Sequence, residues 1–311
     1  MLNPYKIISG QFELNIMKYK TNSFSNIIRT PIVKIIIGGL ICILLPVLIN
    51  KLLLDNLFKM LEFNDNLNIS VRVCITMFIL MPLFYIILFR SLEKRRISEL
   101  DITNVKSIIL SFILSILIIG ISFILLNIIG LITISDVQVP ELIILNVIVV
   151  ISFVLIEEFF FRAIFYRIIE SSWGTKIALV LSALIFALLH LSNENTSILS
   201  FLSVISGGLV LGILYTYTKN LFAPIAFHFG WNLSQVLLGF GLSGGDEFNK
   251  LYVFNLNVKG NTILTGGESG VENSVLIVII LLALFAILYK MSQQENKIIY
   301  RQQRVKLSKK E

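Results

Sequence analysis

The residues that could carry out chemistry are concentrated in three stretches of an otherwise apolar chain. Glu157 and Glu158 are adjacent in the stretch VLIEEFFFRAIFYR, and Arg162 follows four residues after Glu158. The chain contains only two histidines, His190 and His228, and each lies in or at the end of an apolar stretch. Ionisable side chains are costly inside a membrane, so residues at such positions are candidates for a functional site.

The spacing of these residues predicts which of them share a helix face. Residues four apart lie on the same face of an α-helix. Glu158 and Arg162 have this spacing, so the guanidinium can neutralise or orient one of the two carboxylates. His228 and Asn232 have the same spacing and point away from their own helix in one direction.

The depth of each group follows from the rise of a helix. A turn is expected near 170–176, so Glu158 precedes it by roughly 12 residues and His190 follows it by roughly 14. At about 1.5 Å per residue, these side chains lie ~18 and ~21 Å from the turn, near the middle of a membrane. His228 lies about 8 residues into its own helix, ~12 Å from the inner side. We therefore expect three helices to converge on one buried polar site.

This residue set indicates hydrolysis. Adjacent carboxylates with different partners can differ in protonation, which suits a general base that activates water. His and Asn side chains can donate hydrogen bonds to a developing oxyanion. Glu157, His190 and His228 could instead be three ligands of a catalytic zinc ion with an open fourth position, although no H-E-x-x-H motif is present. The residues leave both routes open, with zinc as the only cofactor they suggest.

The composition indicates a membrane protein. Of the 311 residues, 56% are hydrophobic and only 14% are charged, against about 25% charged in an ordinary soluble domain. Too few polar residues are present to cover the surface of a soluble globule. The net charge is +7. In a multi-pass membrane protein, such an excess of basic residues usually sets the orientation in the membrane and does not indicate a nucleic-acid-binding surface. The composition therefore excludes most soluble folds, a disulfide scaffold, disorder and nucleic-acid binding as the main role.

Eight apolar segments are candidates for spanning helices, which need about 20 mostly apolar residues. They lie at 31–54, 71–89, 107–132, 142–168, 176–191, 199–217, 220–240 and 274–290. We predict an all-α, polytopic membrane protein with about eight transmembrane helices and a polar site in the core of the bundle. Its single helical domain covers 31–290, with the motifs in 142–240, between an N-terminal segment at 1–30 and a basic tail at 291–311.

The distribution of Lys and Arg predicts the orientation. Both ends of the chain and the loops after the even-numbered spans carry most of the basic residues, and the opposite loops carry few. Because cytoplasmic segments have an excess of Lys and Arg, we expect both termini in the cytoplasm and the protein in the cell membrane. Residues 1–30 contain no short apolar region followed by a cleavage site, so we expect the first span to direct insertion.

Three motifs occur in order in successive predicted spans. They are Glu157-Glu158-x-x-x-Arg162, Phe186-x-x-x-His190 and His228-x-x-x-Asn232. In order, spacing and placement they resemble the motifs of the CPBP family, the CAAX-protease and bacteriocin-processing (Abi) family of intramembrane proteases. The resemblance covers about 142–240. One departure is Ala163, where the family often has Gly directly after the Arg.

The resemblance implies a membrane-embedded endopeptidase that cleaves membrane-associated, prenylated or small peptide substrates. The implied catalytic residues are Glu157, Glu158, Arg162, His190, His228 and Asn232. The first acid would activate water, supported by the second acid and the arginine. The histidine of the second motif would position the water or a metal, and the third motif would stabilise the oxyanion. Implied partners are a peptide or membrane-protein substrate and the lipid bilayer.

Two other classes of function stay open. A relative on the same scaffold could act without catalysis, as a bacteriocin-immunity protein or as a membrane protein that binds a protein partner. Chains of Glu and His also relay protons in transporters, but the sequence shows no inverted repeat of the kind that many transporters have. A composition rich in Ile, Asn and Lys favours a bacterial origin. A bacterium largely lacks prenylated proteins, so a secreted peptide, pheromone or bacteriocin precursor is the expected substrate.

Overall fold

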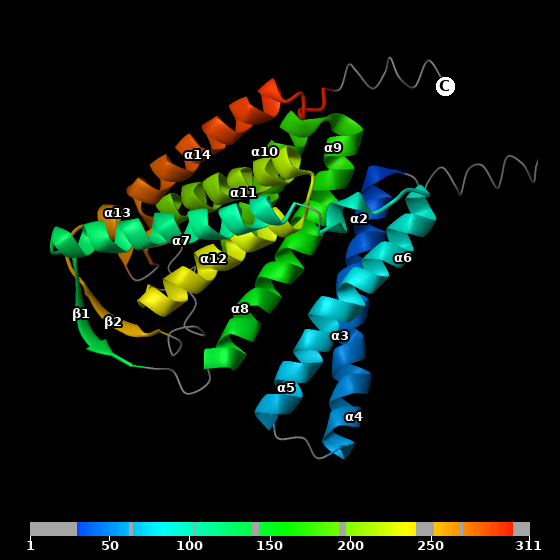
Figure 1. The fold of residues 1–311 in the computed structure, drawn as a ribbon, viewed down its shortest axis with the longest axis horizontal. Coiled ribbons are helices and arrows are strands. Elements are labelled where there is room, and N and C mark those ends of the chain that lie inside the picture. The colour runs from blue at the N-terminus through cyan, green and yellow to red at the C-terminus, as the bar shows by residue number, and fades with distance from the viewer. Residues whose placement is uncertain are drawn as a thin grey trace, which may run out of the picture.

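The computed structural model describes residues 30–61, 65–102, 104–138, 143–192, 197–240, 252–267 and 270–300. Most of these residues are helical, and within them one two-stranded sheet lies at the end of the helices (Figure 1). The all-α class is confirmed, with this small sheet as an addition. Of the predicted terminal segments, 1–29 and 301–311 lie outside the described residues.

Two long helical rods form an N-terminal hairpin, at one side of the molecule in Figure 1. The first rod consists of α2 (Pro31–Gly39), η1 (Leu40–Leu44), α3 (Leu45–Ile49), η2 (Asn50–Leu54) and α4 (Asp55–Met60). The second consists of α5 (Asp65–Cys74), η3 (Ile75–Leu80) and α6 (Met81–Glu93). The segments η1, η2 and η3 are π-helical turns.

The other helices form the body of the molecule. They are α7 (Val105–Ile128), α8 (Ile143–Glu158), α9 (Arg167–Trp173), α10 (Thr175–His190), α11 (Ile198–Thr218), α12 (Phe222–Leu238), α13 (Thr262–Thr265) and α14 (Val275–Gln294). A π-helical segment, η5 (Phe159–Tyr166), joins α8 to α9 in one continuous rod. Helix α12 packs against α7, and α11 packs against both α10 and α14.

Helical rods lie at all eight predicted positions, and five of those described are long and apolar enough to cross a membrane. These five are Pro31–Met60, Asn68–Glu93, Val105–Ile128, Ile198–Thr218 and Val275–Gln294. Helices α10 and α12 have 16 and 17 residues, fewer than the ~20 that a straight span needs. The multi-pass membrane class is thus supported, and the count of eight spans stays a prediction.

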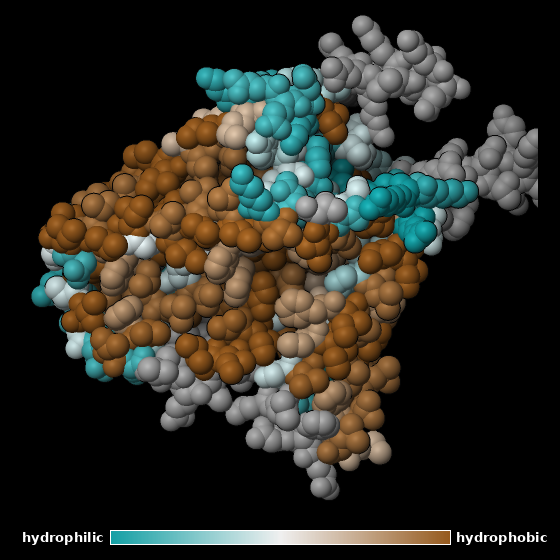
Figure 2. Space-filling model, in the orientation of Figure 1, coloured by the Kyte–Doolittle hydropathy of each residue, from teal (hydrophilic) through white to brown (hydrophobic). Residues whose placement is uncertain are grey.

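The surface has the character that a membrane requires. Apolar side chains cover most of the face in Figure 2. Hydrophilic side chains gather on the side of the molecule where the C-terminal ends of α6, α9 and α14 lie. A protein surrounded by lipid needs such an apolar belt, since charged side chains at membrane depth are costly.

The predicted third span differs from the structure at its end. Helix α7 stops at Ile128, and Gly130 then adopts a positive φ of 75°, which glycine tolerates best. The chain continues as β1 (Ile132–Val137), which pairs antiparallel with β2 (Phe254–Val258). The stretch ITISDV is rich in β-branched residues, which favour strands. Its partner lies about 120 residues away, so the apolar count alone could not predict the pairing.

One glycine permits the contact between α12 and α7. A Cβ atom at Gly230 would lie 2.9 Å from Cδ2 of Phe112, 3.0 Å from its carbonyl oxygen, and closer still to Ser115 Oγ. Side chains do not tolerate such contacts. The absence of a side chain at Gly230 therefore sets how closely α12 approaches α7, on the same helix that carries His228 and Asn232.

We expect Gly230→Ala to lower the free energy of unfolding by about 1–3 kcal/mol, because the added methyl group overpacks the contact with α7. Gly120→Ala is the matched control. Gly120 also lies inside a helix, but no atom lies within 4 Å of its added Cβ, so this change should be neutral or stabilise by up to about 1 kcal/mol. Thermal unfolding in detergent measures both. Equal effects of the two changes would contradict this packing.

Candidate active site

The two adjacent acids lie at the end of α8, directly before η5. Adjacent residues on a helix point about 100° apart, so the two carboxylates meet different surroundings. Glu158 is completely buried, whereas the side chain of Glu157 is 29% exposed. Long π-helical segments are rare and occur often at functional sites. The geometry thus gives one buried acid and one accessible acid at the start of such a segment.

The carboxylate of Glu158 joins two helices. Its Oε1 accepts a hydrogen bond from Arg162 Nη1 at 2.8 Å and lies 2.9 Å from Nδ1 of His228 on α12. Arg162 is also completely buried, and its Nη2 donates to the carbonyl oxygen of Gly208 on α11 at 3.4 Å. A buried ion is tolerated only with a partner and further hydrogen bonds. This ion pair therefore fixes the α8–η5 rod to both α11 and α12.

The carboxylate of Glu157 faces two imidazole rings. Its Oε2 lies 3.6 Å from Nε2 of His228, and its Oε1 lies 3.9 Å from Nε2 of His190 at the end of α10. Both distances exceed a direct hydrogen bond and suit groups that are bridged by a small species such as water. Helices α8, α10 and α12 therefore converge on Glu157, as the depth calculation expects.

The partner of each Nδ1 atom indicates which nitrogen of the His190 and His228 rings carries the proton. Nδ1 of His190 lies 2.8 Å from the carbonyl oxygen of Phe186. A carbonyl oxygen only accepts hydrogen bonds, so this Nδ1 carries a proton. Nδ1 of His228 faces the Glu158 carboxylate, so it too is the donor. In the neutral form, both Nε2 atoms are then acceptors directed at a third acceptor, Glu157. With this assignment, the three acceptors face one another and favour a hydrogen-bond donor such as water between them.

The ring of Phe186 holds three of these groups in place. Its centroid lies 4.4 Å from the ring of His190 and 6.3 Å from the ring of His228, which it meets edge-on. The guanidinium carbon of Arg162 lies 4.9 Å from the same centroid, within the range of a cation–π contact. Phe186 thus forms the wall of the site.

Asn232 stands apart from this network. It lies one turn beyond His228 on α12 and is partly exposed. Its side chain makes no hydrogen bond to any residue that the structure describes. The structure therefore brings five of the six predicted site residues into contact and places the sixth beside them, with its amide unengaged within the described part of the chain.

A metal has no preformed cage in the described part of the chain. No group of three or more His, Cys, Asp or Glu side chains there is arranged to hold an ion. Tetrahedral ligands at about 2.0–2.1 Å from zinc would lie ~3.4 Å apart, whereas Glu157 lies 3.6 and 3.9 Å from its two imidazole neighbours. Zinc ligation by Glu157, His190 and His228 stays a prediction.

The sequence did not identify a second buried acid near α12. The carboxylate of Glu272, in η8 (Val271–Asn273), accepts hydrogen bonds from Trp231 Nε1 at 3.2 Å and Gln235 Nε2 at 2.8 Å. These two residues lie on either side of Asn232 on the helix. Glu272 follows a glycine-rich stretch without a periodic pattern. The only indication in the sequence was the i, i+4 spacing of Trp231 and Gln235, which places two hydrogen-bond donors on one face of the helix.

The comparison with protein families agrees with the three motifs. Residues 138–234, about a third of the chain, match the model of the family described as type II CAAX prenyl endopeptidase Rce1-like. All six predicted site residues lie within this segment. No curated protein and no solved structure matches the chain. The match confirms the resemblance over this segment and supports an endopeptidase of the intramembrane kind.

If zinc is required, the purified protein should carry it in a near 1:1 ratio, and a chelator should remove both the metal and the activity. Elemental analysis and a cleavage assay, before and after chelation, measure the two quantities. His190→Ala should then lower the zinc content as well, because it removes one ligand. Activity that survives complete chelation would contradict the zinc route and favour water activated by Glu157 alone.

Proposed function

We propose that this protein is an intramembrane endopeptidase that hydrolyses peptide bonds with a water molecule activated by Glu157. One observation carries the proposal. The carboxylate of Glu157 is accessible and faces the Nε2 atoms of His190 and His228, and each ring is held by a hydrogen bond at its Nδ1 atom. A water molecule can donate its two hydrogens to Glu157 and to the Nε2 atom of one of the two rings.

In the first step, Glu157 removes a proton from the water, and the water oxygen forms a bond to the carbonyl carbon of the substrate. The Nε2 atom of His190 accepts the second hydrogen of the water and so fixes its orientation. Positioning of this kind converts a bimolecular reaction into an effectively unimolecular one. The carbonyl oxygen of the substrate becomes an oxyanion.

The oxyanion is stabilised from α12. The amide of Asn232, which makes no hydrogen bond to a described residue, donates an N–H group to the oxyanion. Donors of this kind that are fixed before the reaction need no rearrangement as charge develops. Glu157 then returns its proton to the leaving amine as the C–N bond breaks.

The proposal also covers the class of substrate and the side of the protein that faces the cytoplasm. Substrates are peptides or protein segments that reach the site from the membrane, and secreted peptide or bacteriocin precursors fit a bacterial origin. The hydrophilic end of the surface, where α6, α9 and α14 end (Figure 2), faces the cytoplasm in this proposal, as the excess of basic residues favours.

We expect Glu157→Gln to lower kcat by about 10²- to 10⁴-fold, the range that loss of a general base produces. Purified protein in detergent is incubated with a library of quenched fluorescent peptides, some of them lipidated. Glu295→Gln is the matched control, because Glu295 is an exposed carboxylate that binds Tyr217 and Lys297. This control should cleave as fast as the wild type.

Equal cleavage by the wild type and Glu157→Gln would contradict the proposed base. In cells, a biological output that persists in Glu157→Gln at normal protein levels would favour a non-enzymatic role as an immunity or partner-binding protein.

A further inference from the structure

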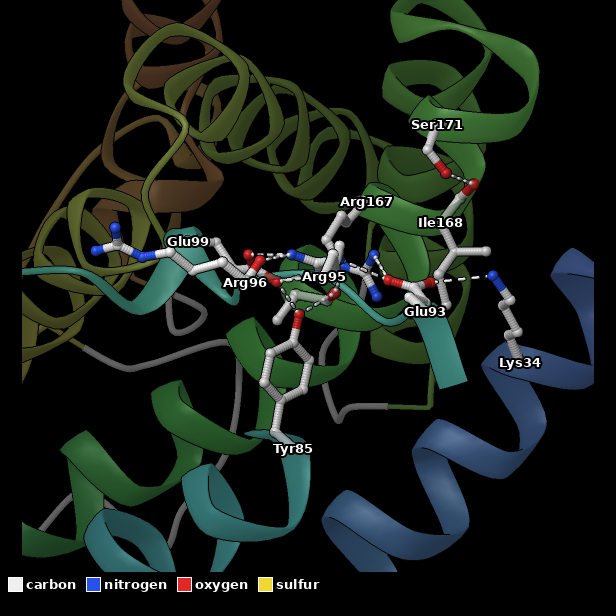
Figure 3. Close-up of polar contacts among 10 residues, drawn as sticks. Lys34, Tyr85, Glu93, Arg95, Arg96, Glu99, Arg167, Ile168 and Ser171 are labelled. Carbon is white, nitrogen blue, oxygen red and sulfur yellow. Dashed lines mark hydrogen bonds and ion pairs between the residues drawn. The ribbon is translucent and has the colours of Figure 1, made fainter. Parts of the chain in front are cut away.

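A buried carboxylate lies in the segment between α6 and α7, outside the site described above. Glu99, in η4 (Ser98–Leu100), has a side chain that is only 4% exposed. Burial of an unpaired carboxylate is strongly unfavourable, so Glu99 must be stabilised by charged or hydrogen-bonding partners. Figure 3 shows the partners around Glu99: Tyr85 from α6, Arg167 from α9, and Arg95 from the connection after α6.

The charge of Glu99 is held by its neighbours. Arg95 donates from Nη1 to Oε2 at 2.7 Å and from Nη2 to Oε1 at 2.5 Å, which makes a bidentate pair. The hydroxyl of Tyr85 on α6 lies 2.5 Å from the same Oε1. Burial raises the pKa of the Glu99 carboxyl, but the hydrogen bonds from Arg95 and Tyr85 and the charge of Arg167 hold it below its ordinary value. Glu99 is therefore ionised at neutral pH.

The same cluster holds the rod that carries the two acids. Tyr85 Oη lies 3.1 Å from the carbonyl oxygen of Ala163, and Arg167 Nε donates to this oxygen at 2.8 Å. Ala163 directly follows Arg162 in η5. Arg167 Nε also lies 3.6 Å from Glu99 Oε1. Tyr85 and Arg167 thus link Glu99 to the helical turn that presents Arg162, and Arg167 Nη1 also donates to Glu93 Oε2 at 2.7 Å.

The backbone of the same segment holds α12. The carbonyl oxygen of Glu99 accepts a hydrogen bond from Leu221 N at 2.8 Å. The carbonyl oxygen of Asp101 accepts one from Asn220 Nδ2 at 2.6 Å. Asn220 Oδ1 in turn accepts from Phe222 N, at the first residue of α12. A segment of a few residues thus contacts the start of the helix that carries His228.

We propose that Glu99 is a positioning residue for the reaction: it ties the α8–η5–α9 rod to the start of α12 and thereby sets the geometry between Glu158 and His228. The inference rests on the proposed function. The Glu158–His228 hydrogen bond joins the same two helices at the site. The cluster around Glu99 therefore adds a second polar connection between the two helices that the Glu158–His228 hydrogen bond joins, in addition to their packing.

The test compares two changes in one segment. Glu99→Gln removes the charge with little change of shape. Asp101→Asn is the matched control, because the Asp101 side chain pairs with Arg96, whose side chain is 79% exposed. Misplacement of a catalytic group by about 1 Å can cost ~10²-fold in rate, so we expect Glu99→Gln to lower kcat about 10- to 100-fold. KM should stay within about twofold, because Glu99 does not contact the substrate. Asp101→Asn should keep wild-type kcat.

A second readout does not depend on activity. The chain has only two histidines, so protein labelled with ¹⁵N-histidine gives two sets of ring signals, which His190→Gln assigns. The Nδ1 signal of His228 reports its hydrogen bond to Glu158. We expect Glu99→Gln to shift this signal and Asp101→Asn to leave it unchanged. If Glu99→Gln does not fold, Tyr85→Phe, which removes only the hydroxyl group, replaces it in both measurements.

The outcomes separate this inference from the proposed function. A loss of kcat together with a shifted His228 signal supports the positioning role. A shifted signal with wild-type kcat, or an unshifted signal, overturns it. If the wild type cleaves no peptide, the proposed function fails, and the His228 signal alone then decides whether Glu99 positions α12.

Discussion

The arrangement of the site depends on the carboxylate of Glu158. One oxygen of this completely buried group contacts both Arg162 and His228. Since a buried ion that loses its partner costs several kcal/mol, the helices that supply the partners must stay at fixed distances. The ion pair stabilises this arrangement rather than the fold as a whole, because a well-packed apolar core would be at least as stable.

The packing of the surrounding helices follows from this constraint. Arg162 reaches the backbone of α11 at Gly208, where a Cβ atom would lie 3.0 Å from Cα of Ala183 on α10. Gly230 has the same role between α12 and α7. Small residues let helices approach closely in membranes, where the hydrophobic effect does not drive helices together. Glycines on two helices therefore allow the polar groups to meet.

The two adjacent acids have separate tasks because of their position on the helix. Glu158 points into the bundle and is used by Arg162 and His228. Glu157 is rotated away from it, stays partly exposed and faces the two Nε2 atoms. A carboxylate held in an ion pair is a poor base, whereas an accessible one beside imidazole rings can take up and return a proton. The geometry of the helix therefore lets Glu158 hold the helices together while its neighbour Glu157 is available as the proposed base.

Part of this arrangement could be predicted from the sequence. The i, i+4 spacing predicted the Glu158–Arg162 pair, and the helical rise predicted that Glu158 and His190 lie at one level. The first follows from the geometry of one helix, and the second from the rise of two helices joined by a short turn. Glu272, the β1–β2 pair and the contacts of Glu99 with Tyr85 and Arg167 could not be predicted, because these partners lie far away in the sequence or on other helices. The protonated nitrogen of each imidazole was likewise set by its neighbours, Phe186 and Glu158.

The most direct test of this account measures activity and stability together in two neighbouring variants, Glu157→Gln and Glu158→Gln. We expect Glu157→Gln to lower kcat by about 10²- to 10⁴-fold and to leave the thermal unfolding temperature unchanged, because this side chain is partly exposed and outside the buried ion pair. We expect Glu158→Gln to lower the unfolding temperature, because it leaves Arg162 without a counter-charge at zero exposure. If Glu157→Gln retained wild-type cleavage, or if Glu158→Gln unfolded like the wild type, the division of tasks between the two acids would be wrong.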